Sequence, residues 1–466
     1  MSKLIGSWSF YKKTILIAVP IMVQNLITNL VAMIDNIMVG QIGTEQMSAV
    51  AIVNQLFFVF NLSIFGSLSG AGIFSAQFFG KEDIEGVRHT MRFKFMTATV
   101  ITAIGILVFL LAGDSLVELY LHDTTEDIDL EKTFMYAKDY MLIMLVGLVP
   151  FAYEQVYSST LREGGITTPS MVAGIIAVLT NVGLNALLIF GIGVFPKLGV
   201  AGAAVATVIS RFVQVAIVIV YSHINSWRLR FIQGLYKSLA VPKKLVKVIM
   251  IKGLLPLTAN ECLWAAGTAA LAQCYSVRGL EVVAAQNIAS TVVNLFNVMF
   301  IAFGSGVSVV IGQMLGANDM KGAKESAPKL VVFAALMCVF IGGLMACFAG
   351  VFPHAYNTTD DVRHLATAFI LISAALMPLH SALHSMYFIV RSGGKTFLTF
   401  ACDCGFSWVV SVPLAHILAN YTSLHIIPLY AICMSAELIK CVVFIILIKK
   451  GVWLSNIVND TKAQLA

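Results

Sequence analysis

The chain has 466 residues, of which 59% are hydrophobic and only 12% are charged, and its formal net charge is +6. Soluble domains carry about 25% charged residues, so this composition excludes an ordinary soluble protein and requires lipid as the solvent. The excess of lysine and arginine does not indicate nucleic-acid binding, because these residues lie in short loops between apolar runs.

Apolar runs long enough to cross a bilayer follow one another along the whole chain. A spanning helix needs about 20 predominantly apolar residues. The first run lacks a small-residue cleavage site, so we interpret it as a transmembrane helix and not as a removed signal peptide. The sequence predicts an all-α integral membrane protein with twelve transmembrane helices, at about 14–39, 49–74, 93–113, 134–157, 167–192, 199–222, 249–275, 283–311, 328–351, 364–389, 396–419 and 425–448.

Positive residues are divided unevenly between the two sets of loops. Twelve spans put both termini on the same side, and 24 Lys and Arg residues lie toward that side against five toward the other, with Arg211 left over inside a span. By the positive-inside rule, this predicts a multi-pass protein of the inner (plasma) membrane with both termini in the cytoplasm. The acidic loop after the third span then lies outside.

The second half of the chain repeats the first. A shift of 236 residues aligns 43–86 with 279–322 without a gap and gives 12 identities in 44 positions. Each copy holds six spans, an even number, so the two copies have the same orientation and are related by an axis along the membrane normal. The prediction is an N-lobe at 1–222 and a C-lobe at 249–466, joined by a basic cytoplasmic linker at 223–248.

Two motifs within this repeat resemble signatures of a known family. Residues 35–43, after Pro20, resemble the first-helix signature of the multidrug and toxic compound extrusion (MATE) family. Residues 312–317 and their first-half partners 76–80 resemble a second signature of that family. The resemblance covers nearly the whole chain. It implies two six-helix lobes, coupling to sodium or protons that enter from outside, and export of amphipathic, often cationic compounds by alternating access.

Polar residues inside the spans form one candidate site in the N-lobe. Inserting a charged residue at mid-bilayer costs a free energy on the order of 3 kcal/mol. Asp35 in the first span is therefore expected to have a structural or functional role. Asn181 and Asn185, four residues apart, point from one face of the fifth span. The resemblance implies a cation site made of Asp35, Asn181, Asn185 and Thr207, whose oxygens suit a hard cation. The alternative is a buried aspartate that is satisfied by two asparagines.

A second candidate site lies in the C-lobe. Glu261 is near the middle of the seventh span, and Trp264 follows on the same helical face, where it can stack on an organic cation. The repeat partner of Glu261 is Asn25 and not Asp35, so the two acids are not inherited symmetry. The resemblance implies that an acid here binds the coupling cation or the substrate. The alternative is a glutamate that is hydrogen-bonded for helix packing.

The tenth span departs from the family pattern. Some family members carry an acid there, whereas this chain has His380 and His384 and no Asp or Glu, and an acid appears instead at Asp403 in the eleventh span. The C-lobe site therefore uses either Glu261 with Asp403 or the two histidines, which leaves the ion stoichiometry open. The histidines lack further ligands for a metal, and the eight cysteines lack zinc spacing. We expect no metal and no cofactor beyond the coupling Na+ or H+.

Three other ionisable residues within the spans are interpreted without a transport role. Arg211 and Glu437 occupy roughly equivalent places in the two repeats, and Glu437 is expected to pair with Lys440 three residues later. Glu154, near the end of the fourth span, is predicted to be solvated.

Three other functions fit the sequence less well. A lipid-linked precursor flippase of the same superfamily needs a positive cluster in its cavity, and Arg211 is the one buried cation that the sequence offers. A polytopic membrane enzyme needs a catalytic constellation that these short loops lack. A major-facilitator transporter carries a basic motif between spans two and three that residues 80–86 do not match. The resemblance implies an exporter of small organic cations, and we expect a monomer that is neither an enzyme nor a nucleic-acid-binding protein.

Overall fold

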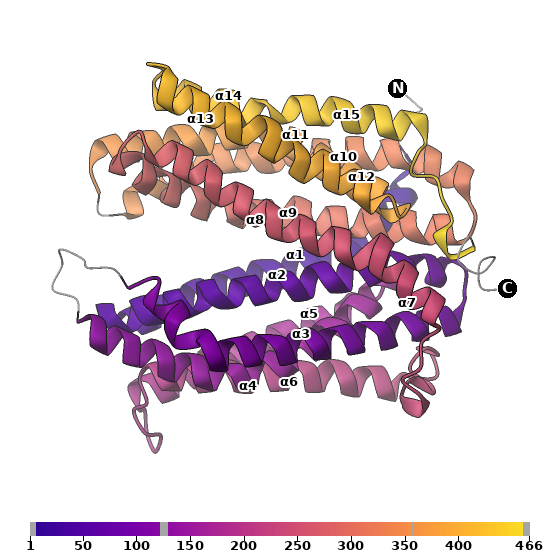
Figure 1. The fold of residues 1–466 in the computed structure, drawn as a ribbon, viewed down its shortest axis with the longest axis horizontal. Helices are drawn as coiled ribbons and strands as arrows, with labels where there is room; N and C mark the ends of the chain where they lie inside the picture. The colour runs from indigo at the N-terminus through magenta and orange to yellow at the C-terminus, as the bar shows by residue number, and fades with distance from the viewer. Residues whose placement is uncertain (1–5, 122–128, 357, 460–466) are drawn as a thin grey trace. The chain divides into compact units, whose positions relative to one another are not determined.

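The computed structural model describes residues 6–121, 129–356 and 358–459, with the backbone alone at 31–33 (Figure 1). Its described part contains twelve helical segments long and apolar enough to cross a membrane, which confirms the predicted fold class and all twelve spans. The first six are α1 (Trp8–Gly40), α2 (Thr44–Gly80), α3 (Ile84–Glu118), α4 (Leu130–Glu163), α5 (Thr168–Phe190) and α6 (Val200–Ile224).

The second six spans are more often interrupted. A short 3-10 turn, η1 (Leu235–Lys237), precedes them. They comprise α7 (Lys243–Ile249), η2 (Met250–Leu254) and α8 (Leu255–Ser276) as one span, then α9 (Leu280–Gly316), α10 (Met320–Phe348), η3 (Phe352–Ala355) as a short turn, and α11 (Asp360–Ser392). The last two spans are α12 (Thr396–Phe400), η4 (Ala401–Gly405), η5 (Ser407–Ser411) and α13 (Val412–Tyr421), then α14 (Ile426–Ser435) and α15 (Glu437–Lys450).

Several helices extend beyond the apolar runs that predict them. Their polar ends are capped by side chains: Asp319 accepts a hydrogen bond from the backbone of Gly322 at 2.8 Å, and Thr359 caps α11 through Val362. Such caps satisfy the free N–H groups of the first turn, so a helix can begin before its apolar part does. Hydropathy therefore locates the spans but underestimates the helices.

The chain folds as two compact units. The C-unit consists of Met1–Met22, Ala76–Asp83 and Lys247–Ala466, and the N-unit consists of Val23–Ser75 and Ile84–Val246. The start of α1 and the C-terminal end of α2 thus belong to the unit that the second half of the chain forms. The predicted lobe boundaries at 222 and 249 remain a prediction.

The two copies of the glycine–glutamine signature meet inside the C-unit. A Cβ atom at Gly80 would overlap the backbone of Gln313, and a Cβ atom at Gly316 would overlap the backbone of Gln77. These positions are equivalent under the 236-residue shift. Only glycine lets two backbones approach so closely. The repeat is therefore also a direct contact between its two copies.

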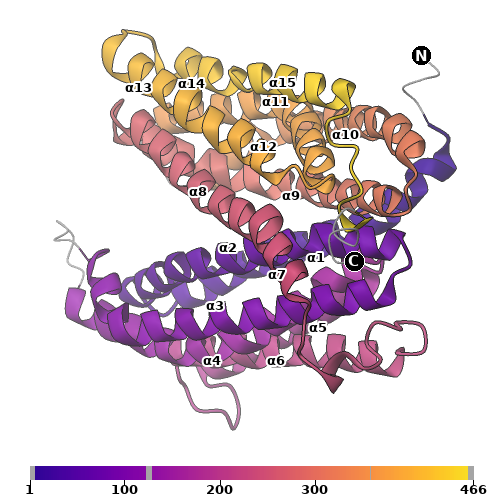
Figure 2. The ribbon, with the colours of Figure 1, turned by 45° about the vertical axis from the view of Figure 1, so that its right-hand side comes forward.

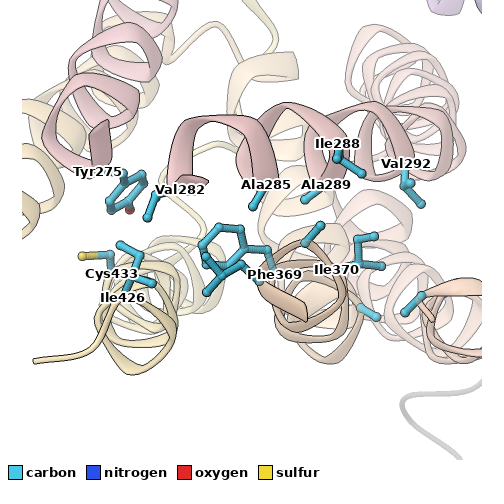
Figure 3. Close-up of a cluster of buried hydrophobic side chains, with 14 of the residues drawn as sticks. Tyr275, Val282, Ala285, Ile288, Ala289, Val292, Phe369, Ile370, Ile426 and Cys433 are labelled. Carbon is cyan, nitrogen blue, oxygen red and sulfur yellow. The ribbon is translucent and has the colours of Figure 1, made fainter. Parts of the chain in front are cut away.

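Small residues let the helices of the C-unit pack closely. In Figure 3, Ala285 and Ala289 of α9 lie over Phe369 and Ile370 of α11 in one buried cluster. Tyr275, at the end of α8, extends this cluster toward Cys433 of α14. Close packing of small against large side chains is the main attraction between helices in lipid.

The two spans that carry Glu261 and Asp403 are locally widened. The π-helical segments η2 and η4–η5 lie in these spans, and α8 runs beside α12 and α13 in Figure 2. Their counterparts in the first half, α1 and α5, carry no such segment where the structure describes them. π-Helical turns are rare and occur frequently at functional sites.

The basic linker is held on the N-unit by Arg92 of α3. The guanidinium donates from Nε to the Leu235 carbonyl at 2.9 Å and from Nη2 to the Gly234 carbonyl at 2.8 Å. Next to these residues, the Tyr236 ring stacks on His223 of α6 with centroids 5.8 Å apart. The turn around η1 is therefore a docked part of the N-unit.

Candidate ion and substrate sites

The four residues predicted for the N-lobe site come together in the N-unit. α1 contributes Asp35, α5 contributes Asn181 and Asn185, and α6 contributes Thr207. The Asn185 amide donates to Asp35 at 2.6 Å and to the Asn181 oxygen at 3.2 Å, and the Asn181 amide donates to the Thr207 hydroxyl at 3.1 Å. Both asparagines are buried and Asp35 is half-buried.

This cluster has more oxygen acceptors than donors. Oδ1 of Asn185 is buried and has no hydrogen-bond partner in the described part of the chain. With the Asn181 amide reversed, its nitrogen would lie 2.9 and 3.1 Å from the two Asp35 oxygens. Asn181 can thus offer either its nitrogen to a lone carboxylate or its oxygen to a bound cation. Because buried polar atoms need partners, the unpartnered oxygen fits a hard-cation site.

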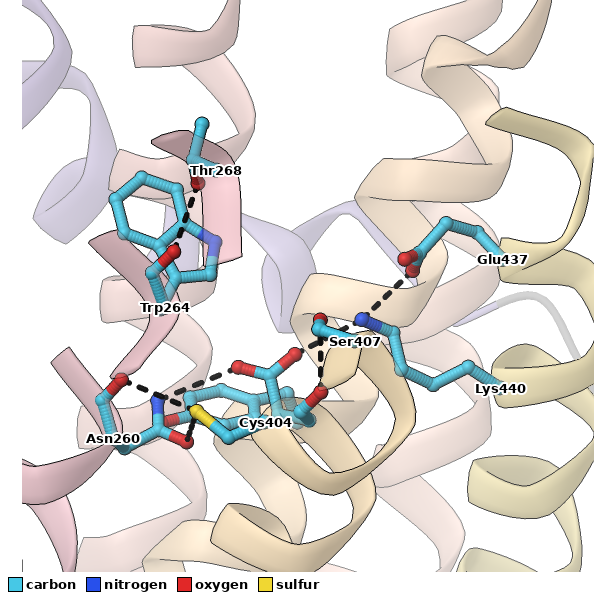
Figure 4. Close-up of polar contacts among 9 residues, drawn as sticks. Asn260, Trp264, Thr268, Cys404, Ser407, Glu437 and Lys440 are labelled. Carbon is cyan, nitrogen blue, oxygen red and sulfur yellow. Dashed lines mark hydrogen bonds and ion pairs between the residues drawn. The ribbon is translucent and has the colours of Figure 1, made fainter. Parts of the chain in front are cut away.

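In the C-unit, Glu261 on α8 is a carboxylate without a direct partner. It is half-buried, and within the described residues it forms neither a hydrogen bond nor an ion pair. Its charge interacts at longer range with Arg391 and Asp403. Trp264, on the same helix, is exposed, and its carbonyl accepts a hydrogen bond from Thr268 at 2.9 Å (Figure 4). Glu261 is therefore free to meet a cation.

Asp403 is not a free acid, because Lys440 of α15 pairs with it. The lysine Nζ lies 2.9 Å from Asp403 Oδ1 and 2.8 Å from Glu437 Oε2 (Figure 4). Asn260 of α8 donates to the other Asp403 oxygen at 3.4 Å. The predicted pairing of Glu437 with Lys440 is confirmed. The link to Asp403 has no signal in the sequence, because the two residues belong to different spans.

His380 and His384 lie on α11, both within electrostatic range of Lys440. The Nε2 atom of each is buried and lacks a hydrogen-bond partner among the described residues. The His384 ring packs edge-on against Phe300 and Phe388, with centroids 5.4 and 5.0 Å away. In the described part of the chain, no group of three or more His, Cys, Asp or Glu side chains is placed to hold a metal ion.

Two sequence expectations are corrected by the structure. Glu154 is buried and not solvated: Ser158 donates to it, and so does Gln155 at 2.8 Å. Its helix continues to Glu163, so Glu154 lies well inside the helix and not at its end.

Arg211 is also not the one buried cation. The structure buries Arg92, Lys94, Arg391 and Lys440, whereas Arg211 itself is half-buried. Lys94 is paired with Glu163 and Lys440 with two acids, whereas Arg391 lies over the rings of Tyr387 and Phe388. These cations are distributed among separate partners and do not form one positive cluster.

The Lys94–Glu163 pair has no signal in the sequence. Lys94 lies at the edge of its predicted span, where a lysine is normally taken to reach the lipid surface. In the structure its ammonium lies 2.6 Å from Glu163, entirely buried between α3 and α4. Gly72 of α2 leaves the space that the Glu163 carboxylate fills. That glycine is visible in the sequence, but its partner is not.

Comparisons with known proteins agree with this architecture. A family model described as MatE matches residues 20–187 and 256–422, two segments that begin at prolines related by the 236-residue shift. The probable multidrug resistance protein YoeA of Bacillus subtilis is 24% identical over 428 residues, which covers 90% of this chain and 89% of YoeA.

Two further proteins extend the comparison. The probable multidrug resistance protein NorM of Thermotoga maritima is 26% identical over 423 residues, 89% of this chain and 86% of NorM. The solved structure of a mutant of the Vibrio cholerae MATE transporter VcmN superimposes with a TM-score of 0.84 at 18% identity. That superposition covers 96% of this chain and 98% of the solved one, and it supports the fold.

Proposed function

Because this chain belongs to the multidrug and toxic compound extrusion (MATE) family of multidrug efflux transporters, we propose that it is an antiporter driven by sodium or protons that exports organic cations. The observation that supports this most is the meeting of Asp35, Asn181, Asn185 and Thr207 around an unpartnered buried oxygen. In this proposal Asp35 binds the coupling ion and Glu261 binds the positive charge of the substrate.

The surroundings of Asp35 and Glu261 suit the two acids to different ligands. Asp35 accepts a hydrogen bond from the Asn185 amide, and the same cluster holds the side-chain oxygens of Asn181, Asn185 and Thr207, which suit a small hard ion or a proton. Glu261 has Trp264 one helical turn away and no competing donor in the described residues, as a bulky organic cation requires. Entry of the ion at Asp35 and release of the substrate at Glu261 would alternate as access alternates between the two sides of the membrane.

The proposal includes the location of the protein. Of the 30 lysines and arginines, 24 lie toward the side of the termini, which supports placement in the plasma membrane with both termini in the cytoplasm. The proposed oligomeric state is a monomer.

The proposal is tested by uptake of ethidium into inverted vesicles under an imposed sodium or proton gradient. Asp35→Asn should bind ethidium but lose gradient-driven uptake. Asp114→Asn, which changes an exposed aspartate at the end of α3, is the matched control and should transport normally. Glu261→Gln should weaken ethidium binding roughly ten- to hundredfold, since a charged contact contributes about 1.5–3 kcal/mol. Normal transport by Asp35→Asn at normal expression would refute the ion site.

A further inference from the structure

The ion pair of Lys440 places a permanent ammonium group among the acids of the C-unit. Its Nζ contacts both Asp403 and Glu437, at 2.9 and 2.8 Å. The lysine side chain is only 8% exposed, whereas the side chains of Asp403 and Glu437 are 19% and 21% exposed. The two carboxylates therefore remain partly accessible, while the charge that neutralises them is covered.

Asp403, one of the acids that this ammonium neutralises, lies within electrostatic range of the acid proposed to bind substrate. Asn260, which donates to Asp403, directly precedes Glu261 on α8, and Glu261 and Asp403 interact electrostatically. The acids of this region are Glu261, Asp403 and Glu437, and its lysine and arginine are Lys440 and Arg391. They leave one net negative charge, which balances a substrate with one positive charge.

The pairing is particular to the C-unit. At the 229-residue shift that relates 162–165 to 391–394, Lys440 corresponds to Arg211 of α6. Arg211 donates to the Gly147 carbonyl at 3.2 Å and lies over the Phe151 ring, and no carboxylate pairs with it in the described residues. A base within a span is thus common to both repeats, but among the described residues only the base of the second repeat pairs with acids.

We propose that Lys440 is a specificity-determining residue that restricts the C-unit to substrates with a single positive charge. As a tethered ammonium, it occupies at Asp403 the place that a second ammonium of a dicationic compound would need. Glu261, which lacks such a resident partner, is left for the one charge of the substrate. This inference rests on the proposed function of Glu261.

The test compares ethidium, which has one positive charge, with propidium, which has the same ring system and a second, quaternary ammonium group. Binding of both dyes to the purified full chain is measured by fluorescence. The wild-type protein should bind ethidium more tightly than propidium. Lys440→Met should raise propidium affinity roughly ten- to hundredfold relative to ethidium, as expected for one new charged contact. Lys440→Arg, which keeps the charge, should leave the preference unchanged.

Further variants cover the case in which two uncompensated acids prevent folding. Lys440→Met with Glu437→Gln leaves Asp403 as a single freed acid and should still gain propidium affinity. Adding Asp403→Asn should abolish that gain. Tighter binding of propidium than ethidium by the wild type, or an unchanged preference in a folded Lys440→Met protein, would overturn the inference. If the wild type binds neither dye, the proposed function fails instead.

Discussion

The buried pair of Lys94 and Glu163 predicts a large loss of stability when the lysine alone is removed. The ammonium lies 2.7 and 2.6 Å from the two Glu163 oxygens and 3.1 and 3.2 Å from the Ser159 and Thr160 hydroxyls. The lysine side chain is 0% exposed and that of Glu163 11%. Lys94→Met leaves a buried carboxylate without its counter-charge, which costs about 3–5 kcal/mol. Lys94→Met with Glu163→Gln should recover much of this loss, because a neutral pair leaves no buried charge.

An exposed pair of the same length provides the control. Lys138 and Asp114 also lie 2.6 Å apart, but their side chains are 44% and 52% exposed. Such a pair contributes about 0–1 kcal/mol, so Lys138→Met should have little effect. The assay is the apparent melting temperature at one scan rate in one detergent. Lys94→Met should melt roughly 5–10 °C below the wild type. The reasoning fails if Lys94→Met and Lys138→Met have the same melting temperature. It also fails if the variant with both Lys94→Met and Glu163→Gln is no more stable than Lys94→Met alone.

Three other predictions follow from contacts described above. Gly316→Val should lower the stability measured by thermal melting by about 1–3 kcal/mol, because the valine side chain displaces the backbone of Gln77. The control is Gly350→Ala, whose added Cβ meets nothing within 4 Å and which should leave the melting temperature unchanged. Equal effects of the two substitutions would contradict the close contact. Arg92→Gln breaks the bonds that dock the linker, so trypsin should cut the linker faster than in the wild type, and unchanged cleavage would exclude this role. An impermeant thiol probe should not label a cysteine introduced at Lys243 in intact cells; labelling from outside would refute the cytoplasmic linker.

The sequence predicts the spans well because each is a local property of its own residues. A run of about 20 apolar side chains determines a spanning helix whatever its neighbours are. The pairing of Glu437 with Lys440 is likewise local, since residues three apart share a helix face. The helix ends are less predictable, because polar turns continue the hydrogen bonding beyond the apolar run. Glu154 shows the consequence: the apolar run ends close to it, but the helix continues to Glu163.

The N-unit cluster was predictable and the C-unit cluster only in part. Asp35 and the two asparagines were named from the family resemblance, and the asparagine spacing placed both amides on one face. The pairing of Asp403 with Lys440 joins two spans through side chains, and no periodicity in either span points to the other. Without that pair, Asp403 looks like a second free acid beside Glu261, and the sequence leaves both possibilities open.

The contact between the two signature copies has the reciprocity of an interface between identical subunits. The glutamine position of each copy meets the glycine position of the other, as in a two-fold symmetric dimer in which residue i meets j and j meets i. A single six-helix chain carrying one copy would have satisfied the same contact by pairing with a second molecule of itself. In a chain that carries both copies the pairing is intramolecular, and residues away from it can differ between the halves, as Glu261 and Asn25 do. A version of the transporter divided between its two halves should therefore reassemble through this contact.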